Sequence, residues 1–225
     1  MKLLVKGKTK DVYTLENGNI LLQFKDNATV DEDGQLDPGG NKVGAIIDGL
    51  GLASLNITKY YFEKIKSAGI LTHYIDSDLG AATMTVSPAT FFGKGLEIIC
   101  RLKATGSFIR RYGDYCAEGK DLDFLIEASL KDDAGGDPMV TSDTLDMLGI
   151  MSKSEYEDVR TLTKQITTLI REDLIAKGLT LYDIKLEFGR INGKVALIDE
   201  ISSGCMRVYK DDKWLHTVEL DKYFS

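Results

Sequence analysis

Alternating apolar and polar residues predict that the first third of the chain is built mainly from strands. The β-prone runs lie at residues 3–5, 12–15 and 20–24, with turn residues Asn17-Gly18-Asn19 between the last two. Residues 25–44 are rich in acidic residues and glycine, which predicts a loop. Apolar residues at helical spacing then predict a helix over about 45–67, which Gly69 is placed to end.

The rest of the chain shows further strands around one long helix. Strands are expected at residues 83–86, 96–101 and 124–130, and the last two at 180–188 and 194–201. An apolar stripe predicts a helix over about 155–177, which begins at a capping box of Ser154 with Glu157 and ends at Lys177-Gly178. Strands, helix and strands in this order predict an α+β fold and not the βαβ alternation of a dinucleotide-binding fold.

Composition and charge narrow the classes of function. The 225 residues include 28 Lys and Arg against 35 Asp and Glu, a formal charge of −7, so nucleic acid and anionic membrane surfaces are not expected partners. We expect no membrane helix, since no apolar run approaches about 18 residues, and no signal peptide, since the apolar run at 3–5 is too short. Three cysteines do not suggest a disulfide framework, so we expect a cytoplasmic protein.

Three lysines alternate along an extended segment near the start of the chain. Lys6, Lys8 and Lys10 are separated by Gly7 and Thr9 between two expected strands. Such a segment can act as a lid whose amides and ammonium groups meet phosphates, although the spacing is not that of a Walker A loop. A solvated lysine edge that discourages strand pairing is the alternative. The net negative charge of the chain does not exclude a polyphosphate ligand, because basic residues such as these lysines can gather at one site.

A second basic segment follows the expected strand at 96–101. Arg101 ends that strand, and Gly106-Ser107 precedes a short turn that we expect to be helical and that carries Arg110-Arg111. Turn amides, a serine hydroxyl and a bidentate arginine together would hold a phosphate monoester. The alternative is a surface loop whose arginines pair with some of the acidic residues.

An acidic, glycine-rich loop spans residues 130–138. It contains Lys131, Asp132, Asp133 and Asp137, and its carboxylates could bind a hard cation, although the spacing is not that of an EF-hand. Asp and Gly before Pro138 are equally typical of an ordinary turn.

The strand at 181–188 alternates strictly, so its three charged residues share one face. They are Asp183, Lys185 and Glu187. If the following hairpin pairs Glu187 with Asp199, the two carboxylates are direct neighbours, which is destabilising unless a cation lies between them. A two-residue Asn192-Gly193 turn would instead place Glu187 opposite Ile198 and Asp199 on the apolar face. We expect the first register, with Mg²⁺ held by Glu187 and Asp199. A solvated charged face is the alternative.

Seven groups of short segments, in this order, are spread over nearly the whole chain. They are Gly7-Lys8-Thr9-Lys10, Phe24-Lys25-Asp26-Asn27-Ala28-Thr29, Asn41-Lys42, Ala104-Thr105-Gly106-Ser107, Lys131-Asp132-Asp133 with Gly136-Asp137-Pro138-Met139, Asp183-Ile184-Lys185-Leu186-Glu187-Phe188-Gly189, and Asp199-Glu200-Ile201-Ser202. Together they resemble the phosphoribosylaminoimidazole-succinocarboxamide synthase (SAICAR synthetase) family. The resemblance implies a two-lobed α+β fold related to ATP-grasp enzymes, with antiparallel sheets and flanking helices. We expect an N-terminal ATP-lid lobe over 1–78 and a nucleotide-, substrate- and metal-binding lobe over 79–225.

The resemblance also implies an ATP-dependent carbon–nitrogen ligase of de novo purine biosynthesis. Its substrates would be ATP, L-aspartate and 5-amino-1-(5-phospho-D-ribosyl)imidazole-4-carboxylate (carboxyaminoimidazole ribonucleotide). Its products would be SAICAR, ADP and phosphate, formed through an acyl phosphate that needs no protein nucleophile. Such a route is consistent with the lack of a recognisable Ser/His or Cys/His pair. A homodimer is expected by the same resemblance.

The family's site residues carry over onto matching positions of this sequence. Gly7, Lys8, Thr9 and Lys10 would form the lid on the ATP phosphates, and Glu187 and Asp199 would hold Mg²⁺. The phosphate of the ribonucleotide would be held by Arg101, Ser107 and Arg207. The reacting region would be lined by Lys131, Asp137, Lys185 and Asp183.

Three positions depart from the family's usual pattern. Gly40 and Leu102 each replace an expected Asn, and Ser203-Gly204 stands where Pro-Asp commonly follows. The last departure keeps two alternatives open: a related carboxylate–amine ligase with a different acceptor, and a non-catalytic nucleotide-binding homologue.

Overall fold

The computed structural model describes residues 1–30, 33–34, 36–37, 40, 42–132 and 135–224. Asp31, Glu32, Asn41 and Asp133, which belong to the expected loop and motifs, lie outside the described residues. Among the described residues, no helix is long and apolar enough to cross a membrane.

The chain forms two compact units, each built from segments that are separate in the sequence. The first comprises Met1–Pro88, Glu200–Met206 and Trp214–Ser225, and the second comprises Ala89–Asp199 and Arg207–Lys213. The chain therefore first passes from one unit to the other after Pro88. The lobe boundary expected at residue 78 stays a prediction.

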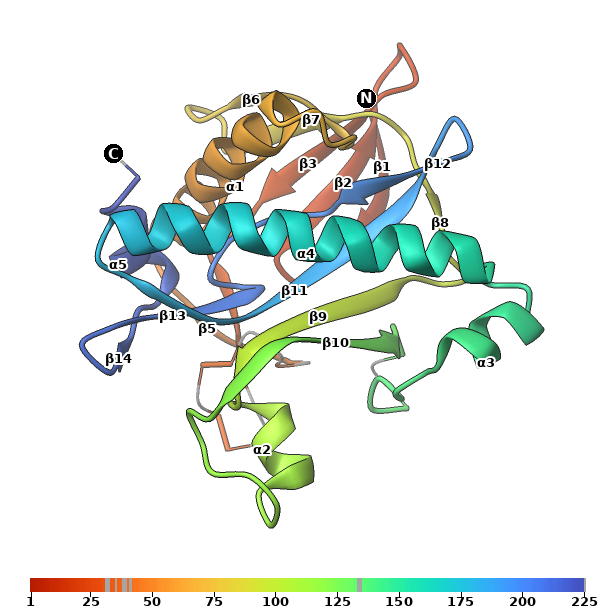
Figure 1. Ribbon diagram of the computed structural model, residues 1–225. Coiled ribbons are helices and arrows are strands. Elements are labelled where there is room, and N and C mark those ends of the chain that lie inside the picture. Colours follow the sequence, from red (N-terminus) through yellow and green to blue (C-terminus); the bar gives the residue numbers. More distant parts are fainter. Residues whose placement is uncertain (31–32, 35, 38–39, 41, 133–134, 225) are drawn as a thin grey trace. The chain divides into compact units, whose positions relative to one another are not determined.

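The first unit contains a five-stranded antiparallel sheet (Figure 1). Its order is β1 (Lys2–Lys6), β2 (Lys10–Thr14), β3 (Ile20–Phe24), β7 (Thr83–Val86) and β6 (Tyr74–Asp78). Alternate residues of β3 and β7 enter the core, including Leu22, Met84 and Val86. The strands predicted within this sheet are confirmed, and β6 is an addition.

Residues 25–44 do not form the single loop that was expected. Among the described residues of this segment, β4 (Asn27–Val30) pairs antiparallel with β5 (Lys42–Ile46). Because β5 uses the start of the expected helix, α1 (Leu50–Ser67) begins after Gly49, whose φ of 78° is left-handed. Gly69 follows the helix with a φ of 78°, as predicted. The composition predicted a loop because acidic residues and glycine are typical of loops, although two short strands lie within the described part of the segment.

The C-terminal helix α5 (Thr217–Asp221) completes the first unit beside α1. The Asn56 amide donates to the Asp221 carboxylate at 2.7 Å. Phe224 packs edge-on against Tyr60 and Tyr61, with ring centroids 5.0 and 5.3 Å apart. Residues from both ends of the sequence therefore share this core.

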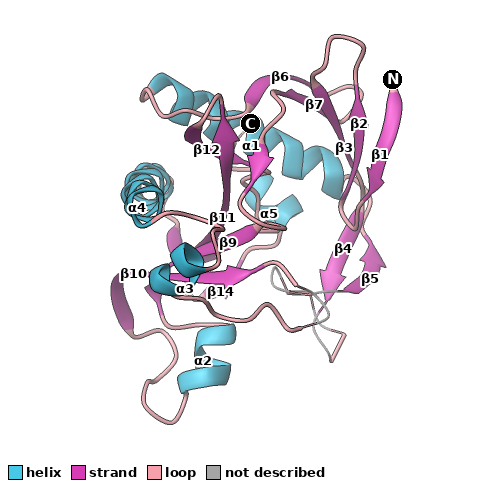
Figure 2. Cartoon of the chain, turned by 90° about the vertical axis from the view of Figure 1, so that its right-hand side faces the viewer, coloured by secondary structure: helices cyan, strands magenta, loops and turns pink. Residues whose placement is uncertain are grey.

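The second unit is built on a seven-stranded sheet. Its main order is β10 (Asp121–Leu130), β9 (Leu96–Lys103), β11 (Thr180–Ile191), β13 (Met206–Lys210) and β14 (Lys213–Trp214), while β12 (Lys194–Ile198) and β8 (Thr90–Phe91) also pair with β11. Figures 1 and 2 show α4 (Lys153–Ala176) running across one face of β9, β10 and β11. The two short helices of this unit are α2 (Ser107–Tyr112), which was expected, and α3 (Ser142–Met147).

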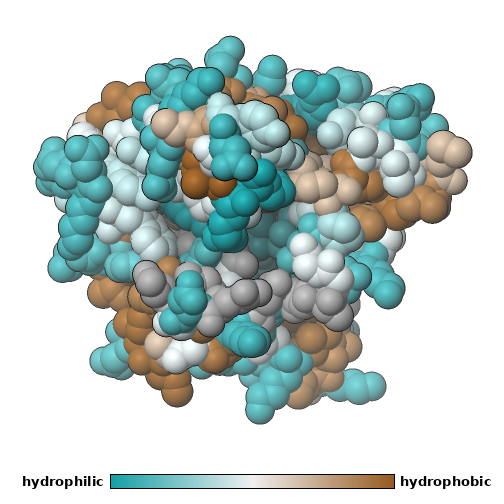
Figure 3. All heavy atoms as spheres, turned by 90° about the horizontal axis from the view of Figure 1, so that it is seen from below, coloured by the Kyte–Doolittle hydropathy of each residue, from teal (hydrophilic) through white to brown (hydrophobic). Residues whose placement is uncertain are grey.

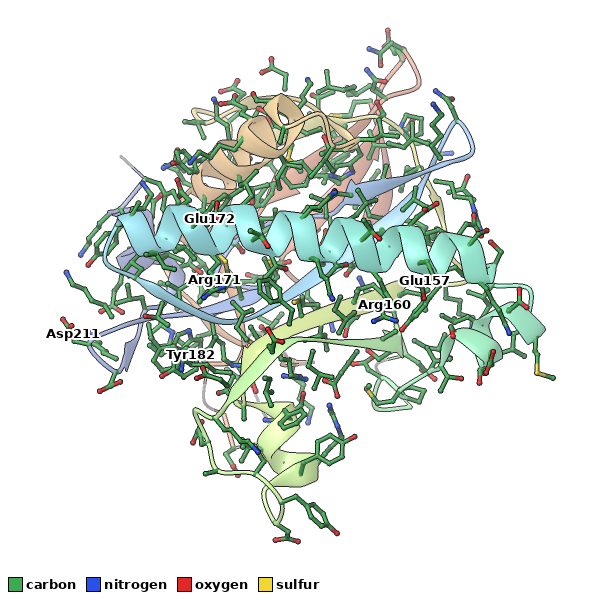
Figure 4. The ribbon with its side chains drawn as sticks, in the orientation of Figure 1. Glu157, Arg160, Arg171, Glu172, Tyr182 and Asp211 are labelled. Atoms are coloured by element: carbon green, nitrogen blue, oxygen red, sulfur yellow. The ribbon has the colours of Figure 1, made fainter. Side chains whose placement is uncertain are left out.

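The long helix α4 has the predicted apolar stripe but begins two residues earlier than expected. Its capping box is Ser152 with Glu155, not Ser154 with Glu157. Overlapping Ser-x-x-Glu frames made both starts plausible, and Glu155 is fixed in addition by Arg190 at 2.6 Å. Figure 4 shows charged residues along this helix, where Glu157, Arg160, Arg171 and Glu172 are exposed.

An irregularity in β10 sets its alignment with β9. Asp121 pairs with Lys103 but Leu125 pairs with Arg101, so β10 has two extra residues at this point. Asp123 and Phe124 absorb them with φ values of 43° and 57°. After this bulge Glu127 lies opposite Ile99, which is two residues from Arg101 along β9, so the side chains of Glu127 and Arg101 are on the same face of the sheet.

Candidate active site

One face of the central strands in the second unit is apolar against α4, and the other is charged. Cross-strand pairs on the charged face include Asp183 with Arg101 and Glu187 with Glu97. Because side chains alternate along each strand, the charged residues of β9, β10 and β11 gather on this one face. They include Glu97, Arg101, Glu127, Asp183, Lys185 and Glu187, whereas Arg190 of β11 lies on the other face, where it pairs with Glu155 of α4.

The register expected for the β11–β12 hairpin is wrong. Glu187 lies opposite Ile198, because the Asn192-Gly193 turn has φ values of 50° and 75°, as a two-residue type I′ turn requires. β12 ends at Ile198, and Asp199 has a φ of 65°. Asp199 therefore lies outside the strand, and strand alternation does not force its side chain onto the apolar face. The error was to extend strand alternation past the end of the strand.

Glu187 and Asp199 are nonetheless electrostatic neighbours. Burial and the charge of Asp199 raise the pKa of Glu187, and the ammonium groups of Lys131 and Lys185 oppose that rise. The Lys131 ammonium lies 2.7 Å from the Glu187 carboxylate. Four of the predicted site residues therefore come together at one end of the charged face.

Lys185 is held in its charged form. Its ammonium lies 2.6 Å from the Glu97 carboxylate. Burial alone would lower the pKa of Lys185, but Glu97, Glu187 and Asp199 together raise it above its ordinary value. The raised pKa favours the charged ammonium of Lys185 near neutral pH.

The donor set fits Mg²⁺ but does not form a complete cage. Within the described residues, no group of three or more His, Cys, Asp and Glu side chains is arranged to hold a metal. Glu187 and Asp199 offer two hard oxygen ligands, and a cation would relieve the repulsion that raises the pKa of Glu187. Mg²⁺ usually takes one or two carboxylates and completes its shell with water and phosphate oxygens.

The three residues predicted to hold a phosphate converge at the other end of the charged face. Arg101 is 1% exposed, and its guanidinium donates to Ser107 Oγ at 2.9 Å and to Asp183 Oδ2 at 3.1 Å. Arg207 donates to the same Asp183 oxygen at 2.8 Å. Gly106, with a φ of 55°, permits this packing, since a Cβ there would lie 2.7 Å from the Arg207 guanidinium carbon. Asp183, which was predicted to line the reacting region with Lys131 and Lys185, is therefore hydrogen-bonded to the two arginines of the predicted phosphate site.

Asp137 organises its own loop. Its carboxylate accepts from the Asp132 amide at 2.8 Å, and its amide donates to the Asp132 carbonyl at 3.1 Å. Its φ of 49° is left-handed, which Asp tolerates better than most residues. The described residues of this segment thus show turn geometry, and both the cation-binding interpretation and the role of Asp137 in the reacting region stay predictions.

In the first unit, the predicted lid forms a closed turn. The Gly7 amide donates to the Lys10 carbonyl at 2.9 Å. Lys25 donates to the Gly7 carbonyl at 2.6 Å and Asn27 to the Lys8 carbonyl at 2.8 Å, while the Lys25 amide donates to the Thr9 carbonyl at 2.9 Å. The segment Phe24–Thr29 thus fixes the backbone of the lid.

Lys10 forms an ion pair with Glu200, and both side chains are about nine-tenths buried. Glu200 also accepts from Ser202 Oγ at 2.8 Å. The departure at Ser203 is accommodated within the first unit, where its buried hydroxyl is bonded to Thr217.

Sequence reasoning missed three carboxylates that pair with predicted cations. Glu97 pairs with Lys185, Glu127 with Arg101, and Glu200 with Lys10. Strand parity carried a usable signal for Glu97, because residues 97 and 101 of one strand must share a face. Glu200 belongs to the quoted segment Asp199-Glu200-Ile201-Ser202, but it lies outside any strand, so strand parity gave no signal for its pairing with Lys10.

Comparisons with known proteins show which family the chain resembles. A sequence model of the SAICAR synthetase family matches residues 3–224. The chain is 53% identical over 224 residues to a phosphoribosylaminoimidazole-succinocarboxamide synthase of Clostridium tetani, with 99% of this chain and 98% of that protein covered. It is 36% identical over 207 residues to the protein of that name from Thermotoga maritima, with 91% and 84% covered.

Solved structures of the same family share the fold. The phosphoribosylaminoimidazole-succinocarboxamide synthase of Ehrlichia chaffeensis matches with a TM-score of 0.86 at 26% identity, covering 97% of this chain and 90% of that one. A SAICAR synthetase in complex with ADP matches with a TM-score of 0.85 at 26% identity, covering 98% and 93%. The predicted α+β class with antiparallel sheets is confirmed, and the chain belongs to the SAICAR synthetase family.

Proposed function

We propose that this protein joins L-aspartate to carboxyaminoimidazole ribonucleotide, with hydrolysis of ATP to ADP and phosphate, in de novo purine biosynthesis. Family membership over residues 3–224 supports the reaction, and the likeness to a SAICAR synthetase bound to ADP supports the use of a nucleotide. The observation that carries the proposal is the charged face, which holds a lysine–carboxylate cluster at one end and an arginine–serine cluster at the other.

The chemistry explains why such a face suits the reaction. A carboxylate is a poor acylating agent, so its oxygen attacks the γ-phosphorus of ATP and ADP leaves. The aspartate nitrogen then attacks the acyl carbon, the carbon–oxygen bond to the phosphate breaks, and the amine loses one proton. Both steps need positioning and neutralisation of negative charge more than a protein nucleophile.

The residues divide these tasks by charge. Lys131 and Lys185 stabilise negative charge in the reacting region, and the raised pKa of Lys185 keeps its charge constant. Glu187 and Asp199 would hold Mg²⁺, which neutralises phosphate charge when bound. The ammonium groups of Lys8 and Lys10 in the lid would contact ATP phosphates, and Asp137 would line the reacting region. Arg101, Ser107 and Arg207 would hold the phosphate of the ribonucleotide.

Location and assembly belong to the same proposal. The cysteines Cys100, Cys116 and Cys205 are free, which fits the reducing cytoplasm. The face in Figure 3 mixes hydrophilic and apolar areas and singles out no interface. The homodimer therefore stays a prediction.

Release of ADP tests the function directly. We expect release with the ribonucleotide, ATP and Mg²⁺ only when L-aspartate is added, together with formation of SAICAR detected by mass spectrometry. Release with another amine but not aspartate would replace this proposal with a related ligase. An absence of release with any amine would favour a non-catalytic nucleotide-binding protein. Ser203-Gly204, which stands where the family commonly has Pro-Asp, makes both controls necessary.

A further inference from the structure

Glu127 lies between two arginines on the charged face of the second unit. Arg101 donates to Glu127 through Nε, and Arg111 donates through Nη2 to both carboxylate oxygens at 2.8 and 2.9 Å. Glu127 is 8% exposed and Arg101 1%. A buried carboxylate shared by two guanidinium groups forms strong, oriented hydrogen bonds.

Glu127 links Arg101 to the residues predicted to hold the phosphate. It takes the Nε edge of Arg101, while the Nη groups donate to Ser107 Oγ and to Asp183, which also accepts from Arg207. Arg111 comes from α2, the helix that begins at Ser107, and its side chain is 31% exposed. The three guanidinium groups of Arg101, Arg111 and Arg207 share two carboxylates, those of Glu127 and Asp183, so one positive charge is left over and a further anion beside them would be stabilised.

We propose that Glu127 is a positioning residue for the phosphate of the ribonucleotide, and that Arg111 is a further binding residue for that phosphate. This inference rests on the proposed function. Glu127 orients Arg101 and draws Arg111 toward the same anion, so that Arg101, Arg111, Arg207 and Ser107 surround it. The carboxylate also offsets part of the repulsion among the guanidinium groups while the site is empty of ligand.

Glu127→Gln tests the positioning role because it keeps the size of the side chain and removes its charge. We expect KM for the ribonucleotide to rise about tenfold or more, with kcat and KM for ATP changed less than about twofold. Arg111→Gln should raise the same KM by a smaller factor, and Glu127→Asp should restore part of the loss. The matched control is Asp121→Asn, since Asp121 belongs to the same strand and pairs with Lys103 at 2.8 Å, but is mostly exposed.

Direct binding of ribose 5-phosphate separates this inference from the proposed reaction. Calorimetry should show binding to the wild-type protein, loss of affinity by about the same factor in Glu127→Gln, and no comparable binding of ribose. Turnover failure with this binding pattern would reject the reaction and leave the positioning role intact. An unchanged ribonucleotide KM in folded Glu127→Gln, an equal rise in KM for ATP, or equal binding of ribose would overturn the inference.

Discussion

At the scale of single residues, opposite charges come as buried or partly buried pairs in which one member is predicted to contact substrate. Lys185 is matched to Glu97, Lys10 to Glu200, and Arg101 to Glu127. A buried cation without a partner would lose its charge or destabilise the fold. Each pairing therefore keeps a cation charged at a position where burial alone would be costly.

Asp199 is the residue whose backbone and charge can be tested separately. Asp199→Asn retains the φ of 65°, because Asn also tolerates the left-handed region, but removes the charge next to Glu187. We expect the Mg²⁺ concentration for half-maximal turnover to rise at least about tenfold. Removing the charge also lowers the pKa of Glu187, since Asp199 helps to raise it.

A magnesium titration of ATP turnover provides the measurement. Asp212→Asn is the matched control, because Asp212 also has a left-handed φ, of 62°, and is exposed. An unaltered Mg²⁺ requirement in Asp199→Asn would show that this carboxylate does not hold the metal.

At the scale of elements, strong periodicity was a better guide than turns and boundaries. The apolar stripe of α4 and the alternation of β11 follow directly from the spacing of residues along the chain. The start of α4 did not, because two Ser-x-x-Glu frames overlap there. The hairpin register depended on the backbone angles of Asn192, Gly193 and Asp199, which the pattern of apolar residues does not encode.

In the candidate site, too, some residues could be predicted from the sequence and others could not. The sequence motifs identified the lysines, arginines and the Glu187–Asp199 pair that the structure gathers into clusters. Their partners Glu97 and Glu127 were missed because strand pairing between distant segments defines them, and the pairing of Glu200 was missed because that residue lies outside any strand. The position of Asp183 beside Arg101 also required that pairing.

The ion pair at the start of α4 predicts a pH-dependent contribution to stability. Hydrogen bonds from Arg190 lower the pKa of Glu155 to about 2, from an ordinary value of 4.5. A lowered pKa in the folded state stabilises the protein above about pH 4.5, and the contribution is lost as the pH falls toward 2. Because solvent screens this pair, we expect Glu155→Gln to lower the free energy of unfolding by about 1 kcal/mol at pH 7.

Urea unfolding at pH 7 and at pH 3.5 measures this effect, and the difference from wild type should shrink at the lower pH. Gln can still complete a capping box, so the change isolates the charge. Glu157→Gln on the same helix is the control, since its 3.5 Å ion pair with Arg160 is exposed. Equal losses for both variants, or a loss independent of pH, would argue against a special role for Glu155.

At the scale of the whole molecule, neither unit is a continuous stretch of sequence. The first unit needs residues 200–206 and the C-terminal segment in addition to its first 88 residues. Thr58 donates to the Ile201 carbonyl at 3.1 Å, and Tyr61, fully buried, packs against Phe224. The core of this unit is therefore completed only by the last residues of the chain.

A fragment of residues 1–88 should consequently fail to form a fixed tertiary structure. Without Phe224 and Ile201, the buried side of α1 loses packing and hydrogen-bond partners. Near-ultraviolet circular dichroism should show little signal for the fragment, whereas the full chain should show a clear one. Cooperative unfolding of the fragment in urea would contradict this expectation.

The bulge in β10 decides which residue of β9 lies opposite Glu127. If Asp123 and Phe124 took up extended backbone, the inward and outward alternation of the strand would be unchanged, because the bulge holds an even number of extra residues, so the sheet could still assemble. The register of Asp121 with Lys103 would then continue along the strand and slide Glu127 by about 7 Å, two residues along β9, to face Glu97. A change confined to the backbone of two residues would thus take the carboxylate away from Arg101 and place it against a second carboxylate. The left-handed angles of Asp123 and Phe124 are therefore what keeps Glu127 within reach of Arg101.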